Sequence, residues 1–211
     1  MKDYQLQYHR EIERFVKWSH KASDFNLINC SSGNLSHKIQ NDIVLVSQSK
    51  KWLGELKKKN VVILELITGK IIHGQTPTGE LPMHLSVLRE NPSINTVFHF
   101  QSPSATTLSC RMDHNIDYNV IIEVPIYLGE VKHLPYLQPG SIELANAVLE
   151  ATKTAHVIQL SNHGQIITGS NYREVIQRAV FFELACSIIL NNDFKNSILT
   201  PFQIESLKGY R

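Results

Sequence analysis

Two side chains that could bind a metal ion stand at the end of a short, strand-like stretch. Residues 94–98 are rich in apolar and β-branched side chains, and His99 and Gln101 follow them. Side chains two positions apart in an extended chain share a face, so the imidazole and the carboxamide are expected to point the same way. Taken alone, this pair is more typical of a core histidine that is hydrogen-bonded to the backbone, because an amide is a weak metal ligand.

Two distant segments supply further ligand and acid–base groups. Glu80 opens a predicted helix after a turn of Pro, Thr and Gly, and His163 lies at a turn between two apolar strands. A site needs such groups to converge from the ends of separate elements. Glu80 also has a structural interpretation, as a carboxylate stabilised by the helix dipole. His84 lies one turn later on the same helix face, and we expect it to support the site rather than to bind metal.

Loops of small polar residues could hold a phosphate group. Backbone N–H groups, amides and hydroxyls in turns can together cradle an anion. The candidates of this kind are Gly33, Asn34, Ser49, Thr78 and Gly79. The alternative is that these loops are ordinary turns.

Composition restricts the classes of partner. The 211 residues carry a net charge of +2 and are 42% hydrophobic, which is ample for a buried core. The lysine run 57–59 is predicted to be a solvated turn or helix end, and no nucleic-acid partner is expected. Three widely spaced cysteines fit reduced thiols. With no signal peptide visible and the most apolar segment, 179–190, too short for a bilayer, we expect a cytoplasmic protein without membrane contact.

Hydrophobic periodicity and turn residues predict a mixed fold. Helices are predicted over residues 4–24, 79–91, 103–110, 142–152, 172–191 and after Pro201. Strands are predicted over 43–46, 60–66, 70–73, 93–102, 155–160 and 165–168, with a loop at 29–36 and strand and turn at 119–129. We therefore expect one α/β domain over residues 1–211, with a central, mostly antiparallel sheet flanked by helices.

Six motifs, in order along most of the chain, resemble those of the class II aldolase/adducin family. They are Ser32-Gly33-Asn34-Leu35-Ser36 (S-G-N-x-S), Ser47-Gln48-Ser49-Lys50 (T-P-S-G), Thr78-Gly79-Glu80 with His84 (S-S-E…H), His99 to Pro103 (H-x-H-S-P), Pro139-Gly140-Ser141, and Asn162-His163-Gly164 (N-H-G). The family includes fuculose-phosphate and rhamnulose-phosphate aldolases, ribulose-phosphate 4-epimerases and methylthioribulose-phosphate dehydratase.

The resemblance implies a metal site and an acid–base residue. Family enzymes hold a divalent metal, commonly zinc, with three histidines, and the metal stabilises an enediolate as a Lewis acid. His99 and His163 match two of those ligands, and Gln101 replaces the third, which implies weaker binding of zinc or another divalent metal. Glu80 matches the catalytic glutamate that moves protons during carbon–carbon cleavage. Lys50 stands where the family has glycine, and it could either contact a phosphate or fill the pocket.

The resemblance also implies an assembly. Family enzymes form homotetramers with active sites at subunit boundaries, where a tyrosine from a neighbouring C-terminal tail donates a proton. Tyr210 stands at a comparable position. A second family tyrosine belongs to the middle of the chain, where Tyr118, Tyr127 and Tyr136 are equally good candidates.

Two classes of function follow. The first is a metal-dependent lyase acting on a phosphorylated ketose or a similar small hydroxy-carbonyl compound, with a methylthioribulose-phosphate dehydratase-like enzyme as its variant. The second is a non-catalytic, adducin-like assembly protein. Glu80, His99 and His163 favour the first class, whereas Gln101 and Lys50 favour the second.

Overall fold

A single eight-stranded sheet forms the centre of the molecule. The computed structural model describes residues 4–40, 42–111 and 115–210. The strands are β1 (Asn34–Gln40), β2 (Ile43–Ser47), β3 (Val61–Glu65), β4 (Ile71–His73), β5 (Thr96–Phe100), β6 (Val131–Leu134), β7 (Val157–Leu160) and β8 (Gly164–Gly169). Their order is β4-β3-β2-β1-β5-β8-β7-β6. Neighbouring strands are antiparallel except for the parallel pair β6 and β7.

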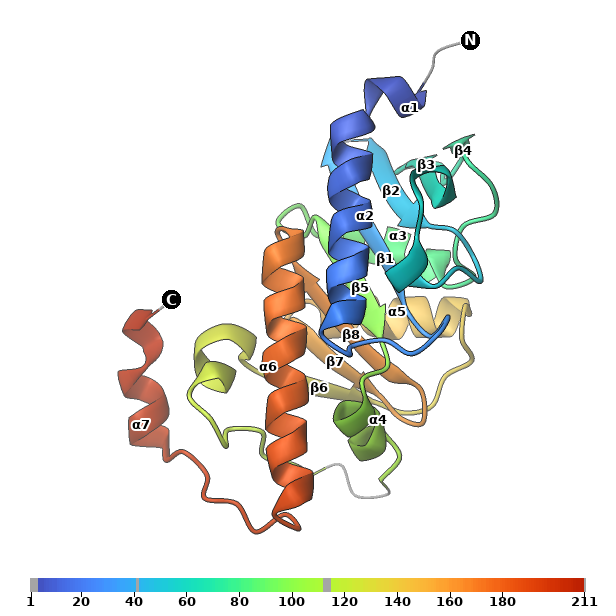
Figure 1. Cartoon of the computed structure of the whole chain (residues 1–211). Coiled ribbons are helices and arrows are strands. Elements are labelled where there is room, and N and C mark those ends of the chain that lie inside the picture. The colour runs from blue at the N-terminus through green and yellow to red at the C-terminus, as the bar shows by residue number, and fades with distance from the viewer. Residues whose placement is uncertain (1–3, 41, 112–114, 211) are drawn as a thin grey trace.

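Helices cover both faces of the sheet (Figure 1). The α-helices are α1 (Tyr4–Gln7), α2 (His9–Asp24), α3 (Leu81–Glu90), α4 (Pro103–Ser109), α5 (Ile142–Ala151), α6 (Tyr172–Asn191) and α7 (Pro201–Ser206). Shorter turns are η1 (Leu53–Glu55), η2 (Lys58–Asn60) and η4 (Lys208–Tyr210), and η3 (Val124–Leu128) is a π-helix. One apolar cluster joins the sheet to α2, α4 and α6, and a second joins it to α3 and α5. The expected α/β fold with a mostly antiparallel sheet is confirmed.

Strand β5 lies at the centre of the sheet and is buried along its whole length. Phe98 and Phe100 face the layer of α2, α4 and α6, and their rings stack with centroids 4.9 Å apart. Val97 faces the layer of α3 and α5. Because side chains alternate along a strand, His99 projects from the same face as Val97, toward the start of α3. Strand β5 thus carries one ionisable side chain, that of His99, in a buried position near its end.

Three sequence predictions of local structure are wrong. The loop expected at 29–36 ends early, because β1 starts at Asn34 and its polar backbone is paired with β2 and β5 on both sides. Of the strand and turn expected at 119–129, turns are found at 119–120 and 122, but the strand is absent and Val124–Leu128 form the π-helix η3. The single helix expected over 4–24 is divided at Tyr8 into α1 and α2. For β1, pairing with its two neighbours overrides a weak local signal.

The C-terminal segment leads away from the sheet (Figure 1). After α6 the chain runs to α7 and η4, and η4 packs against η3. Phe202 is 82% exposed and Tyr210 is 72% exposed. Within the described residues, no helix is both long and apolar enough to cross a membrane.

Candidate metal and acid–base site

Three ionisable side chains from distant segments converge on the α3 side of the sheet. Glu80 is the N-cap residue of α3, His99 is in β5, and His163 is in the turn between β7 and β8. Their potential ligand atoms all lie within 4.8 Å of one another. His99 Nε2 is 3.3 Å from Glu80 Oε2, and His163 Nε2 is 3.5 Å from Glu80 Oε1. The structure therefore brings together the three residues that the sequence singled out.

The protonation of His99 is set by the backbone. Its Nδ1 lies 2.9 Å from the carbonyl oxygen of Gln165. A carbonyl only accepts hydrogen bonds, so Nδ1 carries a hydrogen, and the neutral form of the ring then has its lone pair on Nε2. That lone pair faces a carboxylate oxygen of Glu80, which is also an acceptor. Two acceptors in contact require a cation between them, either a proton or a metal ion.

His163 turns its Nε2 toward the other carboxylate oxygen of Glu80, at 3.5 Å. It lies in a tight turn in which Asn162 adopts the left-handed conformation, with φ of 55°, a region that asparagine tolerates well. Burial, and then the neighbouring His99, lower the pKa of His163, with Glu80 acting in the opposite direction. The neutral form that results is the form that binds metals. His163 Nδ1 and Glu80 Oε1 are buried without hydrogen-bond partners among the described residues.

Glu80 is held as a carboxylate by its neighbours. Burial raises its pKa, but nearby His99, the hydrogen bond from Asn34 and nearby His163 together outweigh burial and lower the pKa below its ordinary value. Its side chain makes no helix-capping hydrogen bond, although it is the N-cap residue. A purely structural role at the helix start therefore does not account for its position.

His84 lies one turn after Glu80 on α3, as the sequence predicts. It is fully buried, and burial lowers its pKa to about 3, so the ring is neutral. Its Nε2 contacts Asn34 Oδ1, and its Nδ1 is 2.7 Å from Ser36 Oγ. Asn34 Nδ2 in turn donates to Glu80 Oε2 at 2.9 Å. The Asn34 amide, which was predicted to bind phosphate, is thus hydrogen-bonded to both Glu80 and His84, and the sequence did not predict these two bonds.

Gln101 lies beside His99, as expected for side chains on one strand face. A Cβ atom placed on Gly164 would lie 2.7 Å from Gln101 Cγ and 3.2 Å from His99 Cε1. It would also lie 2.6 Å from the carbonyl oxygen of Phe100. The glycine after His163 is therefore needed because β5 passes so closely. Binding of metal by the Gln101 amide stays a prediction.

The donor set suits a divalent metal ion. Two imidazole nitrogens and a carboxylate oxygen are ligands that zinc prefers, and three protein ligands leave a coordination position open. Two of the polar atoms, Glu80 Oε1 and His163 Nδ1, are otherwise orphaned. Orphaned buried polar atoms are costly, and a bound cation would satisfy the carboxylate oxygen. His99 and His163, together with Glu80, are the residues that would hold the ion.

The predicted phosphate-binding residues lie in adjoining loops. Thr78 N donates to Ser47 O, and Ser49 N donates to Thr76 O, so the loop after β2 runs beside the loop before α3. Lys50 has a φ of 59°, in the left-handed region. That conformation costs a non-glycine residue about 1–2 kcal/mol, which explains why glycine is typical there.

Among the other glycine candidates, Gly33 is closely packed. Its absent Cβ would lie 2.4 Å from Ile28 Cγ2 and 3.2 Å from the carbonyl oxygen of His99, whereas a Cβ on Gly79 would meet nothing within 4 Å. Gly33 therefore allows its loop to pack closely against β5. Phosphate binding by these residues stays a prediction.

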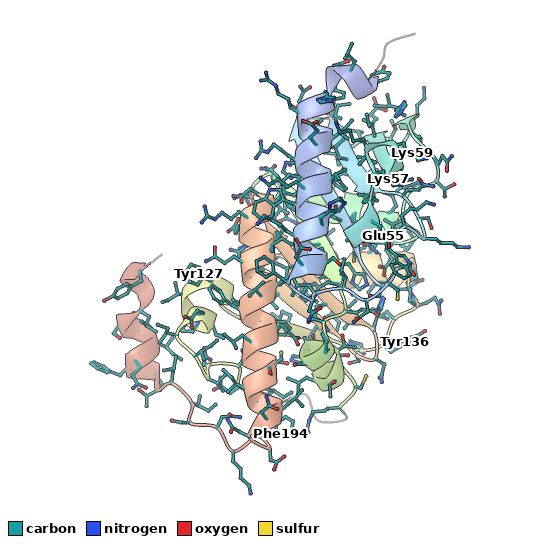
Figure 2. All side chains as sticks on the ribbon, viewed as in Figure 1. Glu55, Lys57, Lys59, Tyr127, Tyr136 and Phe194 are labelled. Carbon is teal, nitrogen blue, oxygen red and sulfur yellow. The ribbon has the colours of Figure 1, made fainter. Side chains whose placement is uncertain are left out.

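A lysine-rich pocket adjoins this loop. It has a volume of about 360 Å³ and is lined by Lys50, Lys51, Trp52, Glu55, Lys57, Lys59 and Asn60. Figure 2 shows Glu55, Lys57 and Lys59 on one flank of the molecule. Lys58, between the last two, instead pairs with Glu13 at 2.6 Å. The run that sequence reasoning treated as simply solvated thus contributes two cations to a concave surface that attracts anions.

The candidate tyrosines differ in burial and in their place in the fold. Tyr118 is buried, and its hydroxyl is 3.0 Å from His133 Nε2. Tyr127 and Tyr136 are 40% and 57% exposed and lie on opposite sides of the view in Figure 2. Tyr210 is on η4, which packs against η3. A catalytic role for any of these tyrosines stays a prediction.

Comparison with known proteins gives a consistent result. The profile of the Class II Aldolase and Adducin N-terminal domain matches residues 13–190. L-fuculose phosphate aldolase of Methanococcus vannielii is 32% identical over 176 residues, covering 83% of this chain and 93% of the relative. 3-oxo-tetronate 4-phosphate decarboxylase of Haemophilus influenzae is 33% identical over 145 residues, covering 66% of this chain and 68% of the relative.

Solved structures share the fold. YgbL from Escherichia coli superimposes with a TM-score of 0.88 at 24% identity, covering 94% of this chain and 98% of that one. An L-fuculose 1-phosphate aldolase superimposes with a TM-score of 0.82 at 20% identity, covering 94% of each chain.

Proposed function

This chain belongs to the class II aldolase and adducin family, and we propose that it is a divalent-metal-dependent lyase that cleaves a carbon–carbon bond in a phosphorylated hydroxy-carbonyl compound. The observation that carries this proposal is the convergence of Glu80, His99 and His163, with an imidazole nitrogen facing each oxygen of a buried carboxylate. An assembly protein without chemistry has no use for such an arrangement, because it is costly to bury without a cation.

A bound zinc ion, or another divalent ion, would act as a Lewis acid that stabilises the negative charge that carbon–carbon cleavage leaves on the substrate. His99 and His163 would hold and orient the ion, with Gln101 as an additional, weaker ligand, and Glu80 would be a ligand only before the substrate binds. Glu80 handles the proton. In aldol cleavage the electron pair of the broken bond passes to the carbon next to the carbonyl, the carbinol oxygen loses a proton, and that carbon gains one. We propose that the Glu80 carboxylate takes up the proton that the carbinol oxygen loses and delivers it to that carbon.

Decarboxylation is a second candidate reaction, supported by the Haemophilus influenzae relative. Loss of CO₂ from a 3-oxo acid leaves the same kind of electron pair next to a carbonyl, and it likewise needs one proton on carbon. The same site could therefore serve either substrate class. A dehydratase reaction and a non-catalytic adducin-like role are the remaining alternatives.

The lysine-rich pocket beside Lys50 supports an anionic substrate. Its four ammonium groups outnumber its one carboxylate. They lie beside the loops of Ser49 and Thr78, where hydroxyls and backbone N–H groups could bind a phosphate. The names of both relatives describe phosphorylated substrates.

We further propose a homotetramer in which Tyr210 acts on a neighbouring subunit's site. Tyr210 is exposed at the end of a segment that leaves the sheet, which suits contact with another copy. Light scattering at micromolar concentration should give four times the 24.0 kDa chain mass. A monomeric mass would refute both the assembly and the role of Tyr210.

The deciding experiment measures metal and turnover on the same preparation. The protein is stripped with a chelator, reloaded with zinc, manganese or cobalt, and offered L-fuculose 1-phosphate and 3-oxo-tetronate 4-phosphate. Both cleavages leave dihydroxyacetone phosphate, so metal-dependent release of lactaldehyde from L-fuculose 1-phosphate would identify an aldolase, and release of CO₂ from 3-oxo-tetronate 4-phosphate a decarboxylase. A reloaded protein that holds metal and converts neither of these nor a wider panel of phosphorylated ketoses would refute the lyase proposal.

A further inference from the structure

A chain of buried hydrogen bonds ends on one oxygen of Glu80. It runs from Ser36 on β1, through His84 on α3, to Asn34 at the start of β1. Ser36 and His84 are fully buried, and Asn34 and Glu80 are 9% and 8% exposed. Such a network is expected to be rigid, because each member has only one partner arrangement that satisfies it.

The direction of every bond in this chain follows from chemistry. The Glu80 carboxylate only accepts, so the Asn34 group facing it is the NH₂, and the Asn34 carbonyl oxygen must face His84. His84 Nε2 therefore carries the hydrogen. In a neutral ring Nδ1 is then the acceptor, and it receives the hydroxyl hydrogen of Ser36. From donor to acceptor, each of the three hydrogen bonds therefore runs along the chain toward Glu80.

This arrangement makes the two oxygens of Glu80 different. Oε2 accepts from Asn34 at 2.9 Å and faces His99 at 3.3 Å. Oε1 is buried and has no hydrogen-bond partner in the described part of the chain, although His163 Nε2 lies 3.5 Å away. An oxygen that already accepts a strong hydrogen bond is the poorer base, so the free oxygen is the better proton carrier.

We propose that Asn34 and His84 are positioning residues that lock the Glu80 carboxylate so that Oε1 is the oxygen that carries the proton. The catalytic part of this proposal rests on the lyase function proposed above. The locking itself rests only on the geometry. The chain ties the start of β1, directly opposite His99 in the sheet, to the first turns of α3. It thereby fixes Glu80 relative to both the strand and the helix.

Three variants and one matched control test the proposal. His84→Phe keeps the ring shape but removes the donor to Asn34, and His84→Gln restores an N–H that can reach it. Asn34→Asp keeps the side-chain shape but replaces the donor by a second carboxylate. The control is His37→Gln. His37 is also on β1 and bonds to Thr96 at 2.8 Å, but it packs against Tyr172 in the other layer.

We expect His84→Phe and Asn34→Asp to lower kcat about 10- to 100-fold, the usual effect of losing a residue that orients a ligand or base. KM should change much less, and His84→Gln should recover most of the loss. His37→Gln should lower thermal stability and leave kcat unchanged. If His84→Phe and Asn34→Asp fold and lose only thermal stability, with kcat retained, the positioning role is refuted.

A second readout needs no substrate. In the metal-free protein, ¹⁵N NMR of the imidazoles should show the hydrogen of His84 on Nε2 and that of His99 on Nδ1, which are opposite tautomers. A His84 hydrogen on Nδ1 would reverse the chain and overturn the proposal. The predicted tautomers in a protein that holds metal but lacks turnover would instead refute the lyase function and leave the locked geometry supported.

Discussion

Replacing Glu80 by glutamine separates its chemical role from its structural role. The carboxamide has the same shape as the carboxylate. Its oxygen can accept from Asn34, which now donates at 2.9 Å, and its NH₂ can donate to His163 Nε2, now 3.5 Å from Glu80 Oε1. The start of α3 is unaffected, because the Glu80 side chain makes no capping bond there. We therefore expect Glu80→Gln to change the free energy of unfolding by no more than about 1 kcal/mol.

The loss of turnover should be far larger. General acid–base catalysis contributes roughly 10²- to 10⁴-fold, so the activation free energy should rise by about 3–5 kcal/mol. The assay combines initial rates on the substrate found in the screen, urea unfolding and metal content, all on one preparation. Glu143→Gln is the control, since Glu143 is an acidic residue in the first turn of α5. Its effect should be confined to a small change in stability.

One outcome would refute this reasoning. If Glu80→Gln turns over substrate at the wild-type rate but unfolds more easily, then Glu80 is only a helix-start carboxylate. The convergence with His99 and His163 would in that case be structural.

Three further predictions concern the surroundings of the site. Gln101→His adds a third imidazole beside His99, so chelator competition should show zinc bound about 10- to 100-fold more tightly; equal affinity would mean that the amide is a competent ligand or that another residue replaces it. Gly164→Ala places a Cβ 2.6 Å from the backbone oxygen of Phe100, and urea unfolding should show a loss of about 1–3 kcal/mol; a loss below about 0.5 kcal/mol would contradict so close an approach of the two strands. Burial lowers the pKa of His37 to about 4 in the folded chain, whereas in the unfolded chain this histidine has its ordinary pKa of about 6.5. Between these two pH values, the unfolded chain binds a proton that the folded chain does not bind. Stability present at pH 7 should be lost between about pH 6.5 and 4, by at most about 3 kcal/mol, and a pH profile unchanged in His37→Gln would exclude His37 as the cause.

Much of the fold was predictable because the informative signals are local. Pro and Gly residues mark the ends of several helices, and α6 was predicted with its observed bounds, Tyr172–Asn191. Strand β1 was missed because Asn34 and Ser36 at its start continue a run of small polar residues typical of a loop, whereas in the fold β2 and β5 pair with it on both sides. Edge strand β6 is just four residues long, too short for a period to be detected.

The residues of the site were predictable from the sequence, but the hydrogen bonds between them were not. Glu80, His99 and His163 each stand at the end of an element and match a family motif, so sequence alone could group them. The hydrogen bonds of Asn34 could not be inferred, because an asparagine in a polar loop has many possible partners. The lysine-rich pocket was missed for a related reason. Whether Lys57 and Lys59 face a hollow or open water depends on how η1 and η2 fold against the sheet.

The order of the strands explains why these residues form one site. Strand β5 lies between β1 and β8, although β1 precedes it by some sixty residues in the chain and β8 follows it by a similar interval. Asn34 stands opposite His99 across one ladder, and Gly164 packs against His99 across the other. Helix α3 begins over the same end of the sheet and supplies Glu80. Each neighbour therefore contacts a different part of the His99 imidazole. The carbonyl oxygen of Gln165 faces Nδ1, the carboxylate of Glu80 faces Nε2, and Gly164 leaves room for the ring edge at Cε1. An imidazole constrained in this way cannot reorient to avoid the carboxylate. A proton or a metal ion must therefore lie between His99 Nε2 and Glu80, and the approach of His163 to the same carboxylate is the reason for expecting metal at this site.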